Sequence, residues 1–198
     1  ETSKDIPNVN YKVEFVYLHQ TAEYQTHNLK SLELVGMGDT VTVIEYGAFV
    51  NCKNLKEVII PDSVTAIENA AFRGCSGLTE VVIPKGVVSI GSGAFKDATS
   101  LTSVQMEDSV ETLYGDVFYG CSKLETVTLS NNIKLIPSYA FYECKKLSSI
   151  NMPTALEEIE AHAFYGCEKL LEVIIPEGVT YIGAYAFEKC DILEKVVI

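Results

Sequence analysis

Histidines and catalytic motifs are the first places to look for chemistry in this sequence. The three histidines are His19, His27 and His162, and none lies at a spacing typical of a catalytic or metal site. Glu158 and Glu160 are close to His162 along the chain, but a solvated histidine is the simpler interpretation. No P-loop, H-E-x-x-H or G-x-S-x-G motif occurs. We therefore expect a protein that is not an enzyme and that uses no cofactor.

Cysteine is the most regularly spaced reactive residue. The six cysteines share one position of a 23-residue spacing, and Ala98 stands where a seventh would be. They are Cys52, Cys75, Cys121, Cys144, Cys167 and Cys190. Zinc ligands lie a few residues apart, so this spacing does not predict a metal site. An even number would allow disulfides in a secreted protein, but side chains at equivalent positions point the same way, whereas a disulfide needs converging Cβ atoms. We favour a row of buried thiols.

The charge of the chain limits its partners. The formal net charge is −12, and the basic residues, fourteen lysines and Arg73, are scattered. This balance argues against nucleic acid, which proteins bind through clusters of lysine and arginine. Nor do we expect direct insertion into a membrane, because no apolar stretch approaches the ~20 residues that cross a bilayer. The acidic clusters at 107–108 and 157–160 lack the spacing of an EF-hand loop, so we expect solvated faces there.

The 23-residue spacing extends over most of the chain. Seven of the eight phenylalanines and an unbroken series of leucines follow it. The phenylalanines are Phe49, Phe72, Phe95, Phe118, Phe141, Phe164 and Phe187, and the leucines are Leu55, Leu78, Leu101, Leu124, Leu147, Leu170 and Leu193. A fixed period of this length predicts a solenoid. Positions that stay apolar in every copy are expected to face its core.

Each copy predicts two short strands and one turn. The segment Leu55–Ile60 alternates and ends at Pro61, which cannot donate to a strand ladder. Val64–Ile67 predicts a second strand, and the A-F-x-x-C segment is too short for more than one helical or 3₁₀ turn. Equivalent strands should stack in parallel, ~4.8 Å apart. The predicted fold class is α/β: a strand-dominated solenoid of 23-residue repeats with short helical or 3₁₀ turns.

We divide the chain into three parts. Residues 1–28 predict an N-terminal cap, a strand or hairpin, because Tyr11 to Leu18 alternates and a first coil needs cover for its apolar face. Residues 29–40 predict a degenerate half repeat, and residues 41–198 predict seven repeats, the last incomplete. The chain ends at a strand position without a polar cap, so we expect the natural protein to continue.

The repeated pattern V-x-x-I-G-x-x-A-F-x-x-C-x-x-L-x-x-V-x-I-P resembles the BspA-type (Treponema-type) leucine-rich repeats over roughly residues 29–198. The resemblance implies a right-handed solenoid and an extracellular or cell-surface location, with any anchor in a segment outside this chain. It also implies an adhesin-like role, in which the domain binds a host matrix protein or receptor. Leucine-rich repeats commonly bind partners on their sheet face.

Two outward surfaces are candidate partner sites. One is a strip of short polar side chains on the middle strands, formed by Ser103, Gln105, Thr126, Thr128, Ser149 and Asn151. The other is a column of Tyr119, Tyr142 and Tyr165, which follow the phenylalanine in three consecutive copies and should stack. Tyrosine is enriched at interfaces. Each surface also has a structural interpretation, as a solvated sheet or as a packing column.

These observations favour a non-enzymatic domain that binds a macromolecule, with a host or neighbouring-cell protein as the expected partner and a glycan as the second choice. Two other interpretations stay open. The chain could be a structural spacer within a larger surface protein, or a carbohydrate-binding module that uses the tyrosine column. The fold does not decide between them, because a fold does not fix a function.

Overall fold

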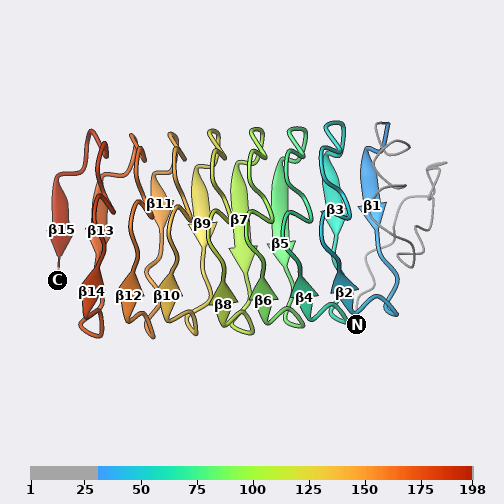
Figure 1. Cartoon of the computed structure of the whole chain (residues 1–198), viewed down its shortest axis with the longest axis horizontal. Helices are drawn as coiled ribbons and strands as arrows, with labels where there is room; N and C mark the ends of the chain where they lie inside the picture. Colours follow the sequence, from blue (N-terminus) through green and yellow to red (C-terminus); the bar gives the residue numbers. More distant parts are fainter. Residues whose placement is uncertain (1–30, 198) are drawn as a thin grey trace, which may run out of the picture.

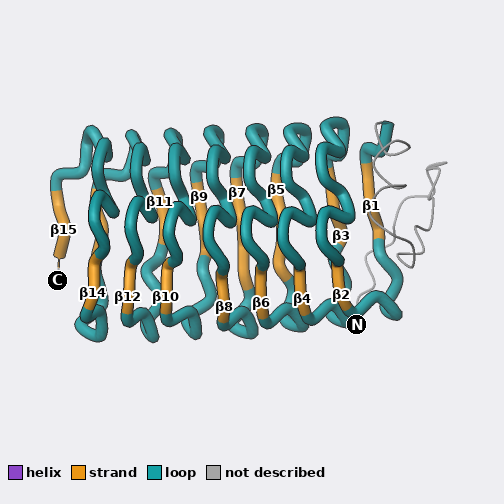
Figure 2. The backbone as a smooth tube through the Cα atoms, in the orientation of Figure 1, coloured by secondary structure: helices purple, strands orange, loops and turns teal. Residues whose placement is uncertain are grey.

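The computed structural model describes residues 31–197, which form an elongated rod of stacked coils (Figure 1). Each coil has 23 residues. One strand of each coil lies on one side of the rod, and a second strand followed by a turn segment lies on the other (Figure 2). The solenoid prediction is confirmed. The predicted cap, residues 1–28, lies outside the described residues.

The odd-numbered strands come from the L-x-x-V-x-I segments and alternate between outward and inward side chains. They are β1 (Leu34–Gly36), β3 (Glu57–Ile59), β5 (Glu80–Ile83), β7 (Ser103–Met106), β9 (Thr126–Thr128), β11 (Ser149–Ile150), β13 (Glu172–Ile174) and β15 (Lys195–Val197).

The even-numbered strands come from the V-x-x-I segments and are two residues long. They are β2 (Val43–Ile44), β4 (Ala66–Ile67), β6 (Ser89–Ile90), β8 (Thr112–Leu113), β10 (Leu135–Ile136), β12 (Glu158–Ile159) and β14 (Tyr181–Ile182). All paired strands are parallel and offset by one repeat, so that Val81 lies opposite Val104 and Val104 opposite Val127. This register puts equivalent residues side by side along the rod.

Strand β1 occupies the strand position of one further coil before the first complete repeat. Val35 pairs with Val58 of β3, and Leu32, Val35 and Met37 pack against the core. This is the place at which the sequence predicts the degenerate half repeat, residues 29–40. Its boundaries at residues 29 and 40 stay predictions.

The core is a set of stacked rows, one for each apolar position of the repeat. The seven phenylalanine rings form a continuous stack with neighbouring centroids 5.2 to 5.5 Å apart and rings within 14° of parallel. Leucines from Leu55 to Leu170 are fully buried. Aromatic pairs at this spacing add to the free energy of area burial, so each coil holds its neighbours through the same side chains.

The turn segment corrects one part of the predicted fold class. We expected a helical or 3₁₀ turn at A-F-x-x-C, but residues 31–197 contain no helix, so the fold is a β-solenoid rather than α/β. The residues two before and two after each phenylalanine have φ near +60°, for example Gly47 and Asn51. A left-handed residue interrupts the run of right-handed conformations that a helix needs.

Those left-handed residues turn alternate N–H groups toward the next coil. Gly47 N donates to Asn69 O at 3.1 Å, and Phe49 N donates to Ala71 O at 2.7 Å. The N–H groups between them close local turns, as from Ala48 to Glu45 O. The turn segment thus adds a third hydrogen-bond ladder between coils, which satisfies backbone groups that would otherwise be buried without partners.

The cysteines form the predicted row of thiols, buried in every copy except at Cys190, which is half-buried. Five of the six thiols donate to the phenylalanine carbonyl of the preceding coil, as from Cys75 to Phe49 O at 3.0 Å and from Cys121 to Phe95 O at 3.1 Å. Cys144, Cys167 and Cys190 repeat this contact. Burial raises the pKa of Cys144 and Cys167 well above the ordinary value and that of Cys190 to about 11.

These raised pKa values predict a loss of stability at alkaline pH. The thiols ionise in the unfolded chain near pH ~8.5 but stay protonated when folded. Their contribution is therefore fully present below that pH and decreases as pH rises toward the folded pKa. At pH about 10, one such thiol should lower the free energy of unfolding by roughly 2 kcal/mol.

The variant Cys144→Ala should remove this increment, and Ala98 shows that the repeat accommodates alanine at the position. Urea unfolding of both proteins at neutral pH and at pH about 10 measures the difference. The wild type should lose more stability than the variant between the two conditions. An equal loss would show that ionisation of this thiol does not contribute.

Candidate partner-binding surfaces

The predicted polar strip lies on the outer side of strands β7, β9 and β11. Ser103 lies opposite Thr126 and Thr126 opposite Ser149, while Gln105 lies opposite Thr128. All are exposed except Ser103, which is half-buried. The strand register therefore brings five of the six predicted residues together in two short polar rows.

Asn151, the sixth residue of the strip, has a structural role instead. Its Oδ1 accepts a hydrogen bond from Leu129 N at 2.7 Å, and its Nδ2 donates to Leu129 O at 3.0 Å. The amide thus pairs with the backbone of the preceding coil in the manner of a strand. In the described chain, the sheet of β5 to β11 ends here and does not pair with β13. The side-chain amide of Asn151 therefore makes its hydrogen bonds within the fold.

The predicted tyrosine column lies on the turn segments. Tyr119 stacks on Tyr142 and Tyr142 on Tyr165, with centroids 4.7 Å apart in both pairs. Lys96 Nζ lies 4.0 Å from the Tyr119 centroid, and Lys189 Nζ lies 4.9 Å from that of Tyr165. Each cation is favourable over the negative face of a ring. The column therefore has its inner ring faces in contact and a lysine at either end.

A second aromatic column lies beside the first. The sequence places Tyr139 and Tyr185 near the tyrosine column, but their contact with His162 was not predicted. Tyr139 stacks on His162 at 4.9 Å, and Tyr185 lies 5.1 Å beyond it. Tyr139 and Tyr142 have centroids 5.5 Å apart, which joins the columns. The signal was available, because all three residues of this column stand two positions before a phenylalanine. We call the two columns together the aromatic ridge: Tyr119, Tyr142, Tyr165, Tyr139, His162 and Tyr185.

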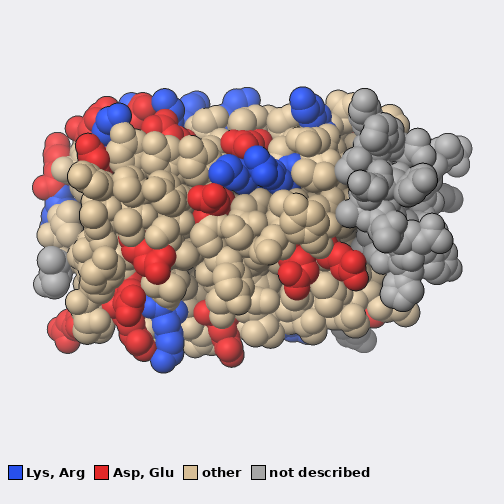
Figure 3. Space-filling view, in the orientation of Figure 1, with Lys and Arg blue, Asp and Glu red and all other residues tan. Residues whose placement is uncertain are grey.

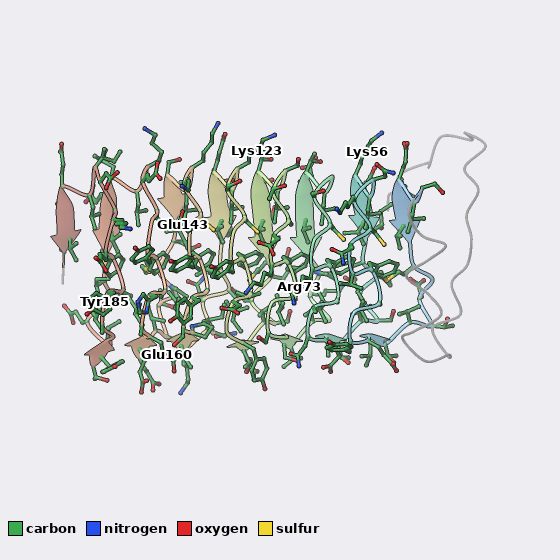
Figure 4. All side chains as sticks on the ribbon, turned by 45° about the horizontal axis from the view of Figure 1, so that its top comes forward. Lys56, Arg73, Lys123, Glu143, Glu160 and Tyr185 are labelled. Carbon is green, nitrogen blue, oxygen red and sulfur yellow. The ribbon has the colours of Figure 1, made fainter. Side chains whose placement is uncertain are left out.

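His162 corrects the expectation of a solvated side chain. It is half-buried between Tyr139 and Tyr185, and its Nδ1 is buried with no hydrogen-bond partner among the described residues. Desolvation is the main cause that raises the pKa of the Tyr142 hydroxyl, and the neighbouring Tyr165 and Tyr119 raise it further. The ridge is thus a partly dehydrated surface. Figure 4 shows Tyr185 at its C-terminal end and Glu143 farther along the same rod.

The acidic clusters serve local contacts. Asp108 accepts a hydrogen bond from Asn131 N at 2.8 Å, and Glu157 pairs with Lys134 at 2.9 Å. Glu160 accepts from both the N–H and the hydroxyl of Ser138 at 2.8 Å. Within residues 31–197, no group of three or more histidine, cysteine, aspartate and glutamate side chains is placed to hold a metal ion. The carboxylates instead connect neighbouring coils.

A profile of the BspA type leucine rich repeat region matches residues 16–147 and 88–198, in six copies. This chain belongs to that family. Its repeats account for the stacked phenylalanines and for the parallel strands of the rod. A search of curated proteins finds no match.

Solved structures of bacterial leucine-rich-repeat proteins share the fold of this BspA-type domain. The Treponema pallidum protein TpLRR is 31% identical with a TM-score of 0.78, over 81% of this chain and 78% of that one. A protein of Eubacterium ventriosum is 34% identical with a TM-score of 0.75, over 79% of this chain and 42% of the other. A leucine rich cell surface protein of Faecalibacterium prausnitzii is 28% identical with a TM-score of 0.50, over 86% of this chain and 61% of that chain.

The BspA-type chain therefore spans about four fifths of one relative and less than half of another. In the part of the chain that the structure describes, no helix is long and apolar enough to cross a membrane. These comparisons show a leucine-rich-repeat domain of the BspA-type family.

The contacts of Asn151 predict that its substitution affects stability. Asn151→Ala removes two hydrogen bonds and leaves the Leu129 N–H and carbonyl unpaired at a sheet end, so it should lower the free energy of unfolding by roughly 1–3 kcal/mol. Thr128→Ala on the same surface should change it by about 0.5 kcal/mol or less. Urea denaturation of both variants provides the comparison. Equal stabilities would argue that the Asn151 amide is free to serve a partner.

Proposed function

We propose that this domain acts outside the cell or on its surface, where it binds a protein partner in an adhesin-like manner and without catalysis. Membership of the BspA-type family supports this role, because leucine-rich-repeat domains generally bind proteins. The similar Faecalibacterium prausnitzii chain is described as a cell surface protein, which supports the location. A host matrix protein or receptor is the partner class that we favour.

The observation that carries the proposal is the aromatic ridge. Tyr185 is 60% exposed and Tyr139 is 37% exposed, whereas the rings beside them are half-buried. Stacking holds these rings before any partner arrives, so little side-chain entropy remains to be lost on binding. Tyrosine side chains dominate many binding interfaces because they combine apolar area with a hydroxyl group. The ridge is therefore our first choice for the contact.

A protein fits the ridge better than a glycan. Sugar rings stack on open aromatic faces, but Tyr119, Tyr142 and Tyr165 cover one another's faces and have lysines at either end. Only the edges of these three rings remain accessible along the column, and ring edges suit the apolar and hydrogen-bonding groups of a protein. We therefore rank the carbohydrate-binding module below a protein-binding domain.

The first test is capture from an array of purified matrix proteins and host-cell glycans at moderate salt. The proposal expects saturable capture of a protein. A response to glycans alone would favour the carbohydrate-binding alternative. An array without any capture would support the spacer, for which the coil-to-coil ladders already provide a stiff rod.

The captured partner then allows the surface to be assigned with two variants. Tyr139→Ala with Tyr185→Ala should weaken capture by at least about tenfold, since it removes the exposed rings of the ridge. Ala70 adopts φ of 56° at the equivalent position, so alanine fits this backbone. The matched variant, Gln105→Lys with Thr128→Lys, changes the polar strip and should capture normally. The reverse pattern would assign the contact to the strip.

A further inference from the structure

A hollow of about 440 Å³ lies on the turn segments of the first three complete coils. Tyr46, Gly47 and Asn51 line it from the first coil, Ala70, Arg73 and Ser76 from the second, and Asp97 from the third, among others. It belongs to the same row of turn segments as the aromatic ridge, toward the N-terminus. Figure 3 shows this face of the rod, with a small group of basic side chains near its middle.

The hollow exists because small residues stand where the ridge has rings. Gly47 and Ala70 occupy the position two before the phenylalanine, which Tyr139, His162 and Tyr185 occupy in later coils. All five residues have φ near +60°, so the backbone follows the same path throughout. The missing side chains, rather than a change of fold, leave the space open.

Arg73 is the residue of the hollow best suited to bind a ligand. It is the one arginine of the chain, and it is exposed. Its backbone is fixed from two sides, because Arg73 N donates to Ala70 O at 3.0 Å and Arg73 O accepts from Asn51 N at 2.7 Å. Among residues 31–197, its guanidinium has no ion-pair partner, in contrast to Lys96, which pairs with Asp116 at 3.1 Å. Figure 4 labels Arg73 near the middle of the rod.

The charges around the hollow favour an anion locally, although the chain as a whole is acidic. Lys53 adds a second cation to the lining and likewise has no ion pair in the described chain. Asp97 is the one carboxylate in the lining of the hollow, and its Oδ1 is directed toward Gly120 of the next coil. A Cβ added at Gly120 would lie 2.6 Å from this oxygen.

We propose that this hollow binds a carboxylate side chain of the protein partner, so that the partner presents an acidic, extended segment along the turn face. The inference rests on the proposed function. Arginine suits this group because its planar guanidinium forms two parallel hydrogen bonds to a carboxylate. The Asn51 and Ser76 side chains supply further polar lining. A segment that continues toward the C-terminus would reach the aromatic ridge.

The experiment measures fluorescence anisotropy of a labelled octapeptide of alternating glutamate and serine on the purified domain. A peptide of alternating glutamine and serine has the same length without the charge. The acidic peptide should bind with saturation and the neutral one should not. Arg73→Gln should weaken binding about tenfold, as expected for a lost charge-assisted pair.

Two further variants separate the hollow from general charge effects. Ala70→Tyr fills the hollow with the residue that position holds in a later coil, Tyr139, so it should fold and still weaken the acidic peptide about tenfold. Lys85→Gln removes an equal charge at a site paired with Asp62, outside the hollow lining, and should bind normally. Urea midpoints of all variants confirm that they are folded.

The inference is overturned if the acidic peptide does not bind, if both peptides bind alike, or if Arg73→Gln and Ala70→Tyr bind like the wild type. Preferential binding of free N-acetylneuraminic acid would also overturn it in favour of a glycan. If Arg73→Gln still captures the array partner while the ridge variant does not, the proposed function stands and the hollow is not its site. If the peptide binds but no protein is captured, the hollow stands and the proposed function fails.

Discussion

Hydrogen bonding between coils is the constraint on which the rest of this structure depends. A single coil has two short strands, which cannot satisfy their own backbone groups, and a turn segment, which satisfies only part of its own. The neighbour one repeat away supplies the partners on both strand sides and along the turn segment. Every coil must therefore repeat its backbone closely, and apolar side chains at equal positions are then stacked in rows. The phenylalanine stack and the thiol row follow from that repetition.

The same constraint explains a backbone that local preference would not select. Nine non-glycine residues between Asn51 and Lys189 have φ near +60°, although a left-handed conformation costs roughly 1–2 kcal/mol for residues other than glycine. Tyr139 and His162 adopt it at the same position as Gly47. The ladder to the next coil offsets this cost, because this conformation directs alternate N–H groups toward the neighbouring coil. Position in the stack overrides residue type here.

The sequence was informative about inward residues and much less so about outward ones. The period alone places Leu55 and Phe72 in the core, because an apolar residue in every copy has one explanation in a solenoid. The prediction of a helical turn at A-F-x-x-C was wrong, because residue types such as tyrosine and histidine do not signal the left-handed backbone that they adopt here. The dual contact of Asn151 with Leu129 could not be predicted either, because it replaces a strand pairing that the other coils make with their backbone. Contacts between different residue types in adjacent coils need the register and the side-chain directions together.

The outward positions on the turn segment are where this domain can vary without loss of its coils. The position two before the phenylalanine contributes its backbone to the ladder and its side chain to the surface, so glycine, alanine, tyrosine and histidine all fit there. Small residues leave the hollow beside Arg73 open, and rings at the same position form the column of Tyr139, His162 and Tyr185. The hollow and this column of the ridge are therefore alternative fillings of one row. A partner that uses both must lie along the rod, because the row runs in that direction and in no other.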